Sequence, residues 1–290
     1  MTMRVLLVGM NSFDSGKTQV AIQLGRQFSN EFQSIEYFKP VSGHNYWYHH
    51  QHTEVCMKNG LLVSRDALTV RETLNSKTPI ELANPVHSLY VPLRLERPMQ
   101  NLTNTLGLSG SSSILTMERF SKPKGSGIDT IVLVAQRLVE EERLVVRQEE
   151  VGMLSTGASI QAINSLEEVQ EFERLNFDQY VSQSFAEVEK SADVVIIEGF
   201  NDSAWPWEGL ESVDVVLLIS PGHIFCYDPE RFRKAVFLMN RRNLPIREVT
   251  FSRMSDLLKP LGRLELRPDS DITLEDLEHL GISFRTGKKD

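Results

Sequence analysis

The sequence has few cysteines, no long apolar run and no excess of basic residues. Its two cysteines, Cys56 and Cys226, lie far apart and match no metal-ligand spacing. We therefore expect no disulfide framework and a reducing compartment, the cytoplasm. The apolar stretch before Asn11 is too short for the core of a signal peptide, and no later run approaches the roughly 18 apolar residues of a membrane span.

The charge and composition are those of a globular, slightly acidic protein. The formal net charge is -8, which argues against a nonspecific nucleic-acid surface. We expect neither nucleic acid nor a membrane as a partner. Hydrophobic residues make up 41% and charged residues 24% of the 290 residues. This length suits one large α/β domain, residues 1–290, with an insertion or extra subdomain at about 94–176.

Apolar runs alternate with segments of helical periodicity along the chain. Five runs predict buried parallel strands, namely Met3–Gly9, Ile35–Phe38, Ala192–Glu198, Val213–Ile219 and Ile246–Phe251. Five segments predict helices, namely Gly16–Phe28, Arg65–Leu74, Ile128–Glu142, Ser165–Glu189 and Pro229–Arg242. Residues 107–113 and 122–127 are expected to be loops. The alternation predicts an α/β fold in which helices flank a doubly wound, mostly parallel sheet.

The strongest motif runs from Gly9 to Thr18, between the first predicted strand and the first predicted helix. Backbone N–H groups at such a helix start bind phosphate oxygens, and a lysine there contributes a positive charge to the terminal phosphates. Thr18 offers a hydroxyl to Mg²⁺. We therefore predict a phosphate-binding loop for Mg-ATP, with nucleotide contacts from Asn11, Ser12, Phe13, Asp14, Ser15, Gly16, Lys17, Thr18 and Gln19.

Two further charged residues follow predicted strands. Lys39 comes after the second strand, and Glu198 ends a later one. Ligands of parallel sheets bind at the carboxyl ends of the strands, so both side chains are expected near the phosphate loop. Lys39 would hold an anionic substrate or stabilise a developing phosphoryl charge, and Glu198 would ligate Mg²⁺ directly or through water. Asp66 opens a predicted helix, where a lone aspartate is usually a cap.

Taken in order, these residues resemble dethiobiotin synthetase. That family has an acidic residue two positions before the glycine of its Gly-Lys-Thr, here Asp14. Its other segments correspond here to Lys39-Pro40-Val41, Asp66-Ala67-Leu68, Asn84-Pro85, Glu198-Gly199 and Leu244-Pro245-Ile246. The order and approximate spacing hold over Met3–Pro92 and Ser191–Arg253, more than half of the chain.

The resemblance implies Mg-ATP as the nucleotide, a homodimer and a small-molecule substrate. It places Thr18, Asp66 and Glu198 around the metal. Lys17 and Lys39 would flank the transferred phosphate, and Ser42 would lie near the substrate, which makes these three the candidate catalytic residues. Members of the family phosphorylate a carbamate formed from a diamine. Two lysines and Mg²⁺ would offset the repulsion between that anion and the γ-phosphate.

Two hypotheses about function follow. The first is a ligase-like enzyme that uses ATP to phosphorylate a small carboxylate or carbamate. Phe200 and Asn201 replace two small residues of the family beside Glu198, which predicts a substrate other than the family's diamine. The second is a regulatory or assembly ATPase that would use the insertion and the loop Trp205–Trp207. The tract around His49, His50 and His52 is expected to be a polar loop.

Overall fold

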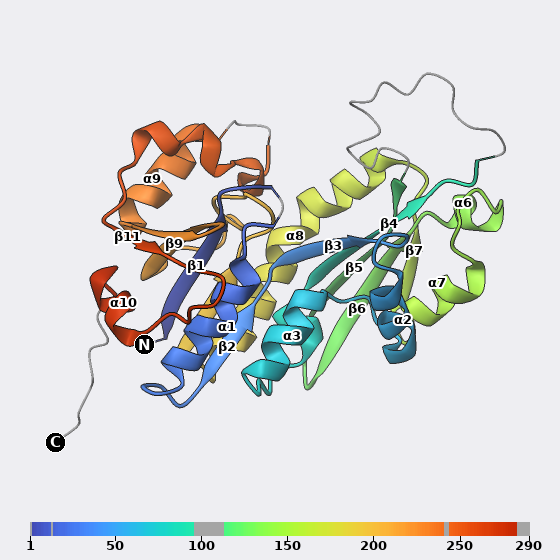
Figure 1. Cartoon of the computed structure of the whole chain (residues 1–290). Coiled ribbons are helices and arrows are strands. Elements are labelled where there is room, and N and C mark those ends of the chain that lie inside the picture. The colour runs from blue at the N-terminus through green and yellow to red at the C-terminus, as the bar shows by residue number, and fades with distance from the viewer. Residues whose placement is uncertain (1, 13, 96–112, 241–243, 283–290) are drawn as a thin grey trace.

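The computed structural model of the chain describes residues 2–12, 14–95, 113–240 and 244–282. Within them the chain forms two mixed β-sheets that lie beside each other, with helices on their faces (Figure 1). The fold is therefore α/β, as expected, but the strands form two sheets and not one. Phe13, the tail Arg285–Asp290 and most of the expected loop 107–113 lie outside the described residues.

The first sheet has six strands in the order β11-β10-β9-β1-β8-β2. Its parallel part comprises β1 (Met3–Gly9), β2 (Ile35–Phe38), β8 (Val194–Glu198) and β9 (Val215–Ser220). Two antiparallel strands, β10 (His223–Tyr227) and β11 (Gly262–Glu265), complete one edge. Because β1 lies between β8 and β9 and is buried on both faces, it is a continuous apolar run.

Helices cover both faces of the first sheet. One face packs against α1 (Lys17–Phe28), α3 (Arg65–Thr73) and α10 (Leu274–His279). The other packs against α8 (Leu166–Glu189) and α9 (Pro229–Met239), and the buried Trp205 and Trp207 belong to the same core. Successive residues of β1 point to opposite faces, so Val5 and Leu7 join one core while Leu6 and Val8 join the other.

The second sheet has the order β3-β4-β5-β6-β7. Its strands are β3 (Val41–Asn45), β4 (Val86–Pro92), β5 (Ser113–Lys124), β6 (Gly127–Val134) and β7 (Ser159–Ala162). Helix α8 packs against β5 as well as against the first sheet, and α4 (Ile80–Ala83) lies beside it. A third core joins the other face to α2 (His50–Asn59), α6 (Gln136–Glu140) and α7 (Gln148–Leu154).

Most of the expected elements are confirmed. The strands Met3–Gly9 and Ile35–Phe38 have the expected bounds, and α1, α3 and α8 differ by a residue at most. Strands β8 and β9 begin two residues later than expected, and α9 ends at Met239. The expected insertion, 94–176, supplies β5, β6 and β7 to the second sheet, whose other two strands precede it in the chain.

The helix expected over Ile128–Glu142 is wrong. Its first half is strand β6, which forms an antiparallel hairpin with β5, and only α6 is helical. The expected loop 122–127 is correspondingly reduced to a tight turn at Gly125, whose φ of 60° suits glycine. The β-branched residues Thr130, Ile131 and Val132 favour a pleated strand once a partner is present, and β5 is that partner.

The strand expected over Ile246–Phe251 is also wrong. Two short 3₁₀ helices, Ile246–Glu248 and Phe251–Arg253, occupy the segment, and a third, Ser255–Leu257, follows. The free edge of β9 is taken by β10, so the segment pairs with residues 202–204 instead. There the Ala204 N–H donates to the Val249 carbonyl at 2.8 Å.

No helix in the described parts of the chain is both long enough and apolar enough to cross a membrane.

Candidate functional site

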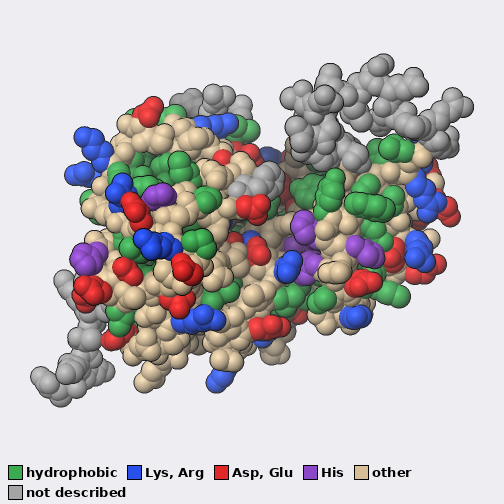
Figure 2. All heavy atoms as spheres, viewed as in Figure 1, with side chains coloured by type: hydrophobic (Ala, Val, Ile, Leu, Met, Phe, Trp, Pro, Cys, Tyr) green, Lys and Arg blue, Asp and Glu red, His purple; other side chains and the backbone are tan. Residues whose placement is uncertain are grey.

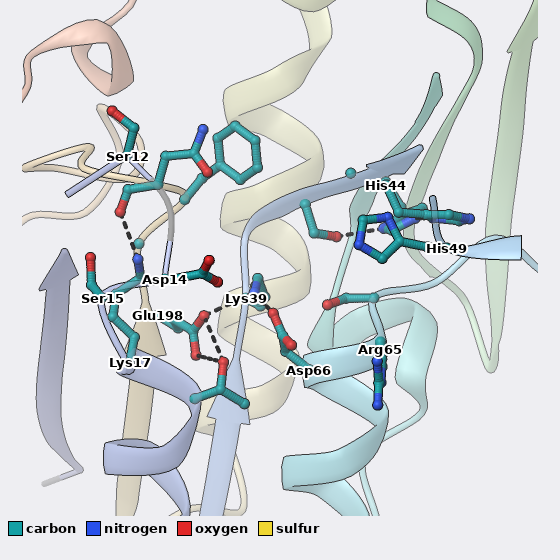
Figure 3. A pocket seen from close by; sticks show the side chains of 18 of the residues that line it. Ser12, Asp14, Ser15, Lys17, Lys39, His44, His49, Arg65, Asp66 and Glu198 are labelled. Carbon is teal, nitrogen blue, oxygen red and sulfur yellow. Dashed lines mark hydrogen bonds and ion pairs between the residues drawn. The ribbon is translucent and has the colours of Figure 1, made fainter. Parts of the chain in front are cut away.

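Three adjacent strands of the first sheet end at one cavity. In the register, Leu7 of β1 is opposite Glu198 of β8, and Phe38 of β2 is opposite Ile197. The chain segments that follow these strands line a cavity of ≈ 470 Å³ (Figure 3). Its size lies within the range of small-ligand sites. The expected site residues Ser12, Asp14, Ser15, Gly16, Lys17, Thr18, Lys39, Ser42, Asp66 and Glu198 all line it.

The loop after β1 is shaped by internal hydrogen bonds and by two left-handed residues. The Ser15 hydroxyl donates to the Asn11 carbonyl at 2.9 Å and accepts from the Asn11 N–H at 3.2 Å. Asp14 has φ 53° and Gly16 has φ 85°. A Cβ at Gly9 would lie 2.4 Å from the Asn201 carbonyl oxygen, so only glycine fits there. The loop is thus a close-packed cradle.

The start of helix α1 offers free donors to this cradle. No side chain caps the helix, and its first turn carries no acidic residue. Among the described residues, none accepts from the backbone N–H groups of Lys17, Thr18 and Gln19. Such a helix start attracts an anion. The side chains of Asn11 and Gln19 themselves are not part of the cavity lining.

Lys17 reaches across the loop instead of into solvent. Its ammonium donates to the Asn201 carbonyl at 2.6 Å. Burial lowers the pKa of Lys17 below its ordinary value, against the attraction of Glu198. Among the described residues its hydrogen-bond partner is a carbonyl, and a partly desolvated ammonium so placed gains much from a nearby anion, so Lys17 is poised to bind one.

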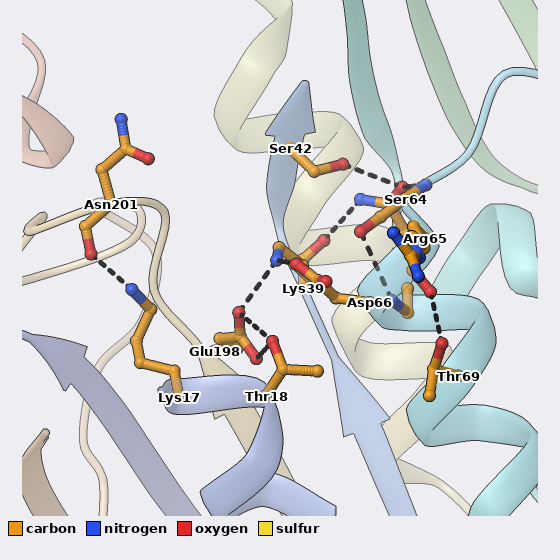
Figure 4. Close-up of polar contacts among 12 residues, drawn as sticks. Lys17, Thr18, Lys39, Ser42, Ser64, Arg65, Asp66, Thr69, Glu198 and Asn201 are labelled. Carbon is orange, nitrogen blue, oxygen red and sulfur yellow. Dashed lines mark hydrogen bonds and ion pairs between the residues drawn. The ribbon is translucent and has the colours of Figure 1, made fainter. Parts of the chain in front are cut away.

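Glu198 is the centre of a buried polar cluster. Its side chain is 2% exposed, and it accepts a hydrogen bond from Lys39 at 2.8 Å (Figure 4). It also accepts a hydrogen bond from Tyr37 at 2.7 Å. Thr18 donates from the start of α1 at 3.2 and 3.3 Å. Lys39 also binds Asp66 at 2.5 Å. Burial alone would lower the pKa of Lys39, but the two carboxylates raise it, so this lysine is charged.

Lys39 therefore bridges the two carboxylates that were expected to hold a metal ion. Glu198 comes from the end of β8 and Asp66 from the first turn of α3, and the ammonium lies between them. Asp66 is not the cap of its helix, because Ser64 accepts from the Ala67 N–H in that role. Two carboxylates and the Thr18 hydroxyl form an all-oxygen donor set, which suits Mg²⁺.

Beyond Lys39, the cavity is lined by residues that the sequence patterns did not indicate. Ser42 bonds to His87 Nδ1 at 2.6 Å, and His87 Nε2 lies 2.7 Å from His44 Nδ1. Asn84 fixes this region, since its side chain donates to the Lys39 carbonyl and accepts from Ser42 and from the Ser64 N–H. Of these residues, the family resemblance had indicated Ser42 and the Asn84-Pro85 pair, and nothing had indicated His44 or His87.

Four histidines gather at this end of the cavity. They are His44, His49, His52 and His87, and Figure 2 shows histidine side chains over β3 and the start of α2. The expected polar loop at His49–His52 is wrong, because α2 begins at His50. Among the described residues, no group of three or more histidine, cysteine or acidic side chains is arranged to hold a metal.

A buried arginine ties the walls of the cavity together. Arg119 of β5 is completely buried, and its guanidinium donates to the Leu62 carbonyl and the Ser121 hydroxyl, both at 2.5 Å. It also donates to the Asn84 carbonyl. No carboxylate among the described residues pairs with it, and burial lowers its pKa to about 10. Arg119 thus holds the segments before α3 and before β4 in place.

A second cavity of ≈ 320 Å³ adjoins the first and shares Ser42, Phe200 and Asn201 with it. Glu118 of β5 lines this cavity and is 2% exposed. One of its oxygens accepts from Ser88 at 2.7 Å, and the other has no partner among the described residues. Burial, with the nearby charge of Glu173, raises the pKa of Glu118 from 4.5 to about 8.

This raised pKa predicts a pH-dependent loss of stability. Between about pH 4.5 and 8 the unfolded chain has released the Glu118 proton while the folded chain retains it, so the free energy of unfolding falls as pH rises. Glu118→Gln cannot ionise and should be more stable than the parent by a few kcal/mol at pH 8, with a smaller difference at pH 5. Urea unfolding of both proteins at the two pH values measures this, and an equal difference at both would contradict it.

The Trp205–Trp207 loop, considered for contact with a partner, does not present its tryptophans to solvent. Trp205 is 0% and Trp207 1% exposed, and the Trp205 indole donates to the Leu210 carbonyl at 3.1 Å. Trp207 packs against Phe38 and Phe185 in the core. These side chains are therefore part of the hydrophobic core.

Comparison with protein-family models, with curated proteins and with solved structures found no match to this chain, so the function is argued from the geometry of this site.

Proposed function

We propose that the chain is an ATP-dependent, ligase-like enzyme that transfers the γ-phosphoryl group of Mg-ATP to a small carboxylate or carbamate. The observation that carries the proposal is the meeting of Lys17, Thr18, Lys39, Asp66 and Glu198 at the carboxyl ends of β1, β8 and β2. The parallel part of the first sheet, with helices on both faces, fits a doubly wound P-loop NTPase core. The resemblance to dethiobiotin synthetase adds support.

The residues present fit a nucleotide with its metal ion. The N–H groups at the start of α1 and the Lys17 ammonium would bind the phosphates, and the Gly9 backbone lets them approach. Thr18, Asp66 and Glu198 would hold Mg²⁺, which supplies charge neutralisation at the γ-phosphoryl group. Lys39 now bridges the two carboxylates, so it would turn toward the transferred phosphoryl group when a cation takes its place.

The same cavity has room for an acceptor beside the phosphates. Lys39 directly follows β2, Ser42 lies three residues later in β3, and the exposed Arg65 also lines the cavity. Cationic and hydroxyl groups suit a carboxylate or carbamate, whose charge must be offset before it approaches a γ-phosphate. The alternative function, a regulatory or assembly ATPase, gains no support from Trp205 and Trp207, because both are buried. The family resemblance also favours a homodimer, which analytical ultracentrifugation would test.

The test is the Lys17→Ala variant. We expect this change to weaken Mg-ATP binding at least ~100-fold, because a charge-assisted bond to phosphate is lost from a partly desolvated site. The fold should persist, since the hydrogen bond that the Lys17 ammonium makes among the described residues is to the Asn201 carbonyl and not to a core side chain. Isothermal titration calorimetry gives the affinity, and circular dichroism reports the fold.

The matched control is Lys124→Ala, which removes an exposed lysine paired with Asp129 at the β5–β6 turn. It should bind Mg-ATP like the parent. Equal affinity of the parent and Lys17→Ala for Mg-ATP, or no binding by the parent, would refute the proposal. Binding with no ADP formed in a screen of carboxylates would favour the regulatory alternative.

A further inference from the structure

A buried chain of hydrogen bonds leads from the cavity into the second sheet. It runs from the Ser42 hydroxyl to His87, then to His44, and ends at Thr53 Oγ1, 3.0 Å from His44 Nε2. The side chains of these four residues are all less than a tenth exposed, and three of them line the cavity. Ser42 and His44 come from β3, which pairs with β4, the strand that carries His87. Thr53 comes from α2, the next element after β3 in the chain.

The ends of this chain fix its chemistry. Asn84 Oδ1 already accepts from the Ser64 N–H at 3.0 Å, so it faces Ser42 as an acceptor. Ser42 can therefore donate either to Asn84 or to His87, and Thr53 can donate either to His44 or to the His49 carbonyl. In one arrangement every donor points from Ser42 toward Thr53, and in the other every donor is reversed. In both arrangements, each hydroxyl and each ring nitrogen of Ser42, His87, His44 and Thr53 has a hydrogen-bond partner.

Both imidazoles are neutral. Burial and the neighbouring histidines lower the pKa of His44 to about 3, and burial holds the pKa of His87 well below its ordinary value. In the first arrangement, a ring nitrogen lone pair of His87 therefore accepts the Ser42 proton at 2.6 Å. A hydroxyl that donates to a base, with the base oriented by a third group, is the arrangement of an activated nucleophile.

We propose that Ser42 is a nucleophile that accepts the γ-phosphoryl group of the bound nucleoside triphosphate, with His87 as its base and His44 as the residue that positions His87. This inference rests on the proposed function for its phosphoryl donor. Its own support is the short contact between Ser42 and His87 and the place of Ser42 in the cavity that also holds Lys17 and Lys39. The product is a phosphoserine on this chain.

Ser42 Oγ bonds to the γ-phosphorus as the bond from that phosphorus to the bridging oxygen breaks, and the electron pair leaves with the nucleoside diphosphate. The Ser42 proton passes to His87 Nδ1, and the N–H at His87 Nε2 keeps its hydrogen bond to His44 Nδ1. A weak base suffices, because phosphoryl transfer has a loose transition state in which the nucleophile carries little charge.

The experiment is a single-turnover reaction of the full chain with γ-labelled Mg-ATP, quenched in acid from milliseconds to minutes. Peptide mass spectrometry then locates the label, and calorimetry measures nucleotide affinity in parallel. We expect one phosphate on Ser42 of the parent and none on that peptide in Ser42→Ala, which removes a single oxygen and should fold. His87→Gln should slow labelling ~10²-fold at saturating nucleotide. His44→Gln should slow it less, with nucleotide affinity unchanged in both variants.

The matched control is Ser88→Ala, which removes a buried hydroxyl of the neighbouring strand that bonds to Glu118 and not to a histidine. It should label like the parent. If the parent binds Mg-ATP and Ser42 carries no phosphate at any time, this inference is overturned and the proposed function stands. If the parent does not bind Mg-ATP, the proposed function falls and this inference with it. Equal labelling rates in His87→Gln and the parent would remove His87 from the step.

Discussion

Replacing Lys39 with methionine should lower the free energy of unfolding by about 3 kcal/mol in buffer without divalent cations. The variant leaves Glu198, which is 2% exposed, without its ammonium partner, although Thr18 and Tyr37 still donate to it. It also leaves Asp66 and Glu198 without the ammonium that now lies between their carboxylates. Millimolar Mg²⁺ should recover much of the loss, because a cation can enter the space between Asp66 and Glu198 that the ammonium vacates. Urea unfolding with and without Mg²⁺ measures both effects.

Lys234→Met is the matched control for this experiment. Lys234 forms an ion pair of 2.5 Å with Glu230 on α9, but both side chains are more than two-thirds exposed. Water screens such a pair, so the change should alter the free energy of unfolding by less than ~1 kcal/mol, with or without Mg²⁺. A Lys39→Met protein as stable as the parent, or one equally destabilised at all Mg²⁺ concentrations, would show that the two carboxylates do not form a cation site.

Arg119→Met should be the most destabilising single change near the cavity, with a loss of about 3–5 kcal/mol. Methionine fills part of the volume but leaves the Leu62 and Asn84 carbonyls buried without their donor. Those carbonyls belong to the segments that lead into α3 and β4, so Asp66 and His87 would lose their fixed positions as well. Thermal and urea unfolding of the variant measure the loss.

The appropriate comparison is Arg174→Met. Arg174 donates twice to Glu171 on the exposed side of α8, so this change also removes two strong guanidinium contacts. Because the pair lies in water, we expect a loss below ~1 kcal/mol. Should Arg119→Met cost no more than this control, the account of Arg119 as the tie between the cavity walls would be wrong.

The half of the site that was predictable from sequence is the half that is local. The segment Gly9–Thr18 runs from the last residue of β1 to the first turn of α1, so the order of residue types along the chain indicates the loop directly. Lys39 and Glu198 could be placed because each follows a strand of the same parallel sheet, and carboxyl ends of parallel strands meet at one edge. Asp66 needed the family resemblance, because alone it resembles a helix cap.

The other half depends on contacts between distant segments. His44 and His87 meet because β3 pairs with β4, and nothing in the local pattern of either strand indicates this partner. The same reason explains the error over Ile128–Glu142, since its strand exists only through pairing with β5. Arg119 and Glu118 lie in β5, where charged residues in a strand are ordinarily read as exposed, but both are buried.

The order of the first sheet also governs how the protein is made. Strand β1 is synthesised long before its two neighbours, because β8 and β9 both lie beyond residue 193. The five strands of the second sheet, between residues 41 and 162, all leave the ribosome before either of them. The Gly9–Thr18 loop therefore cannot meet Glu198 during most of translation. Its candidate ligand can meet the whole site only after Glu198 has emerged, and the apolar β1 has neither of its strand neighbours until β8 follows it out.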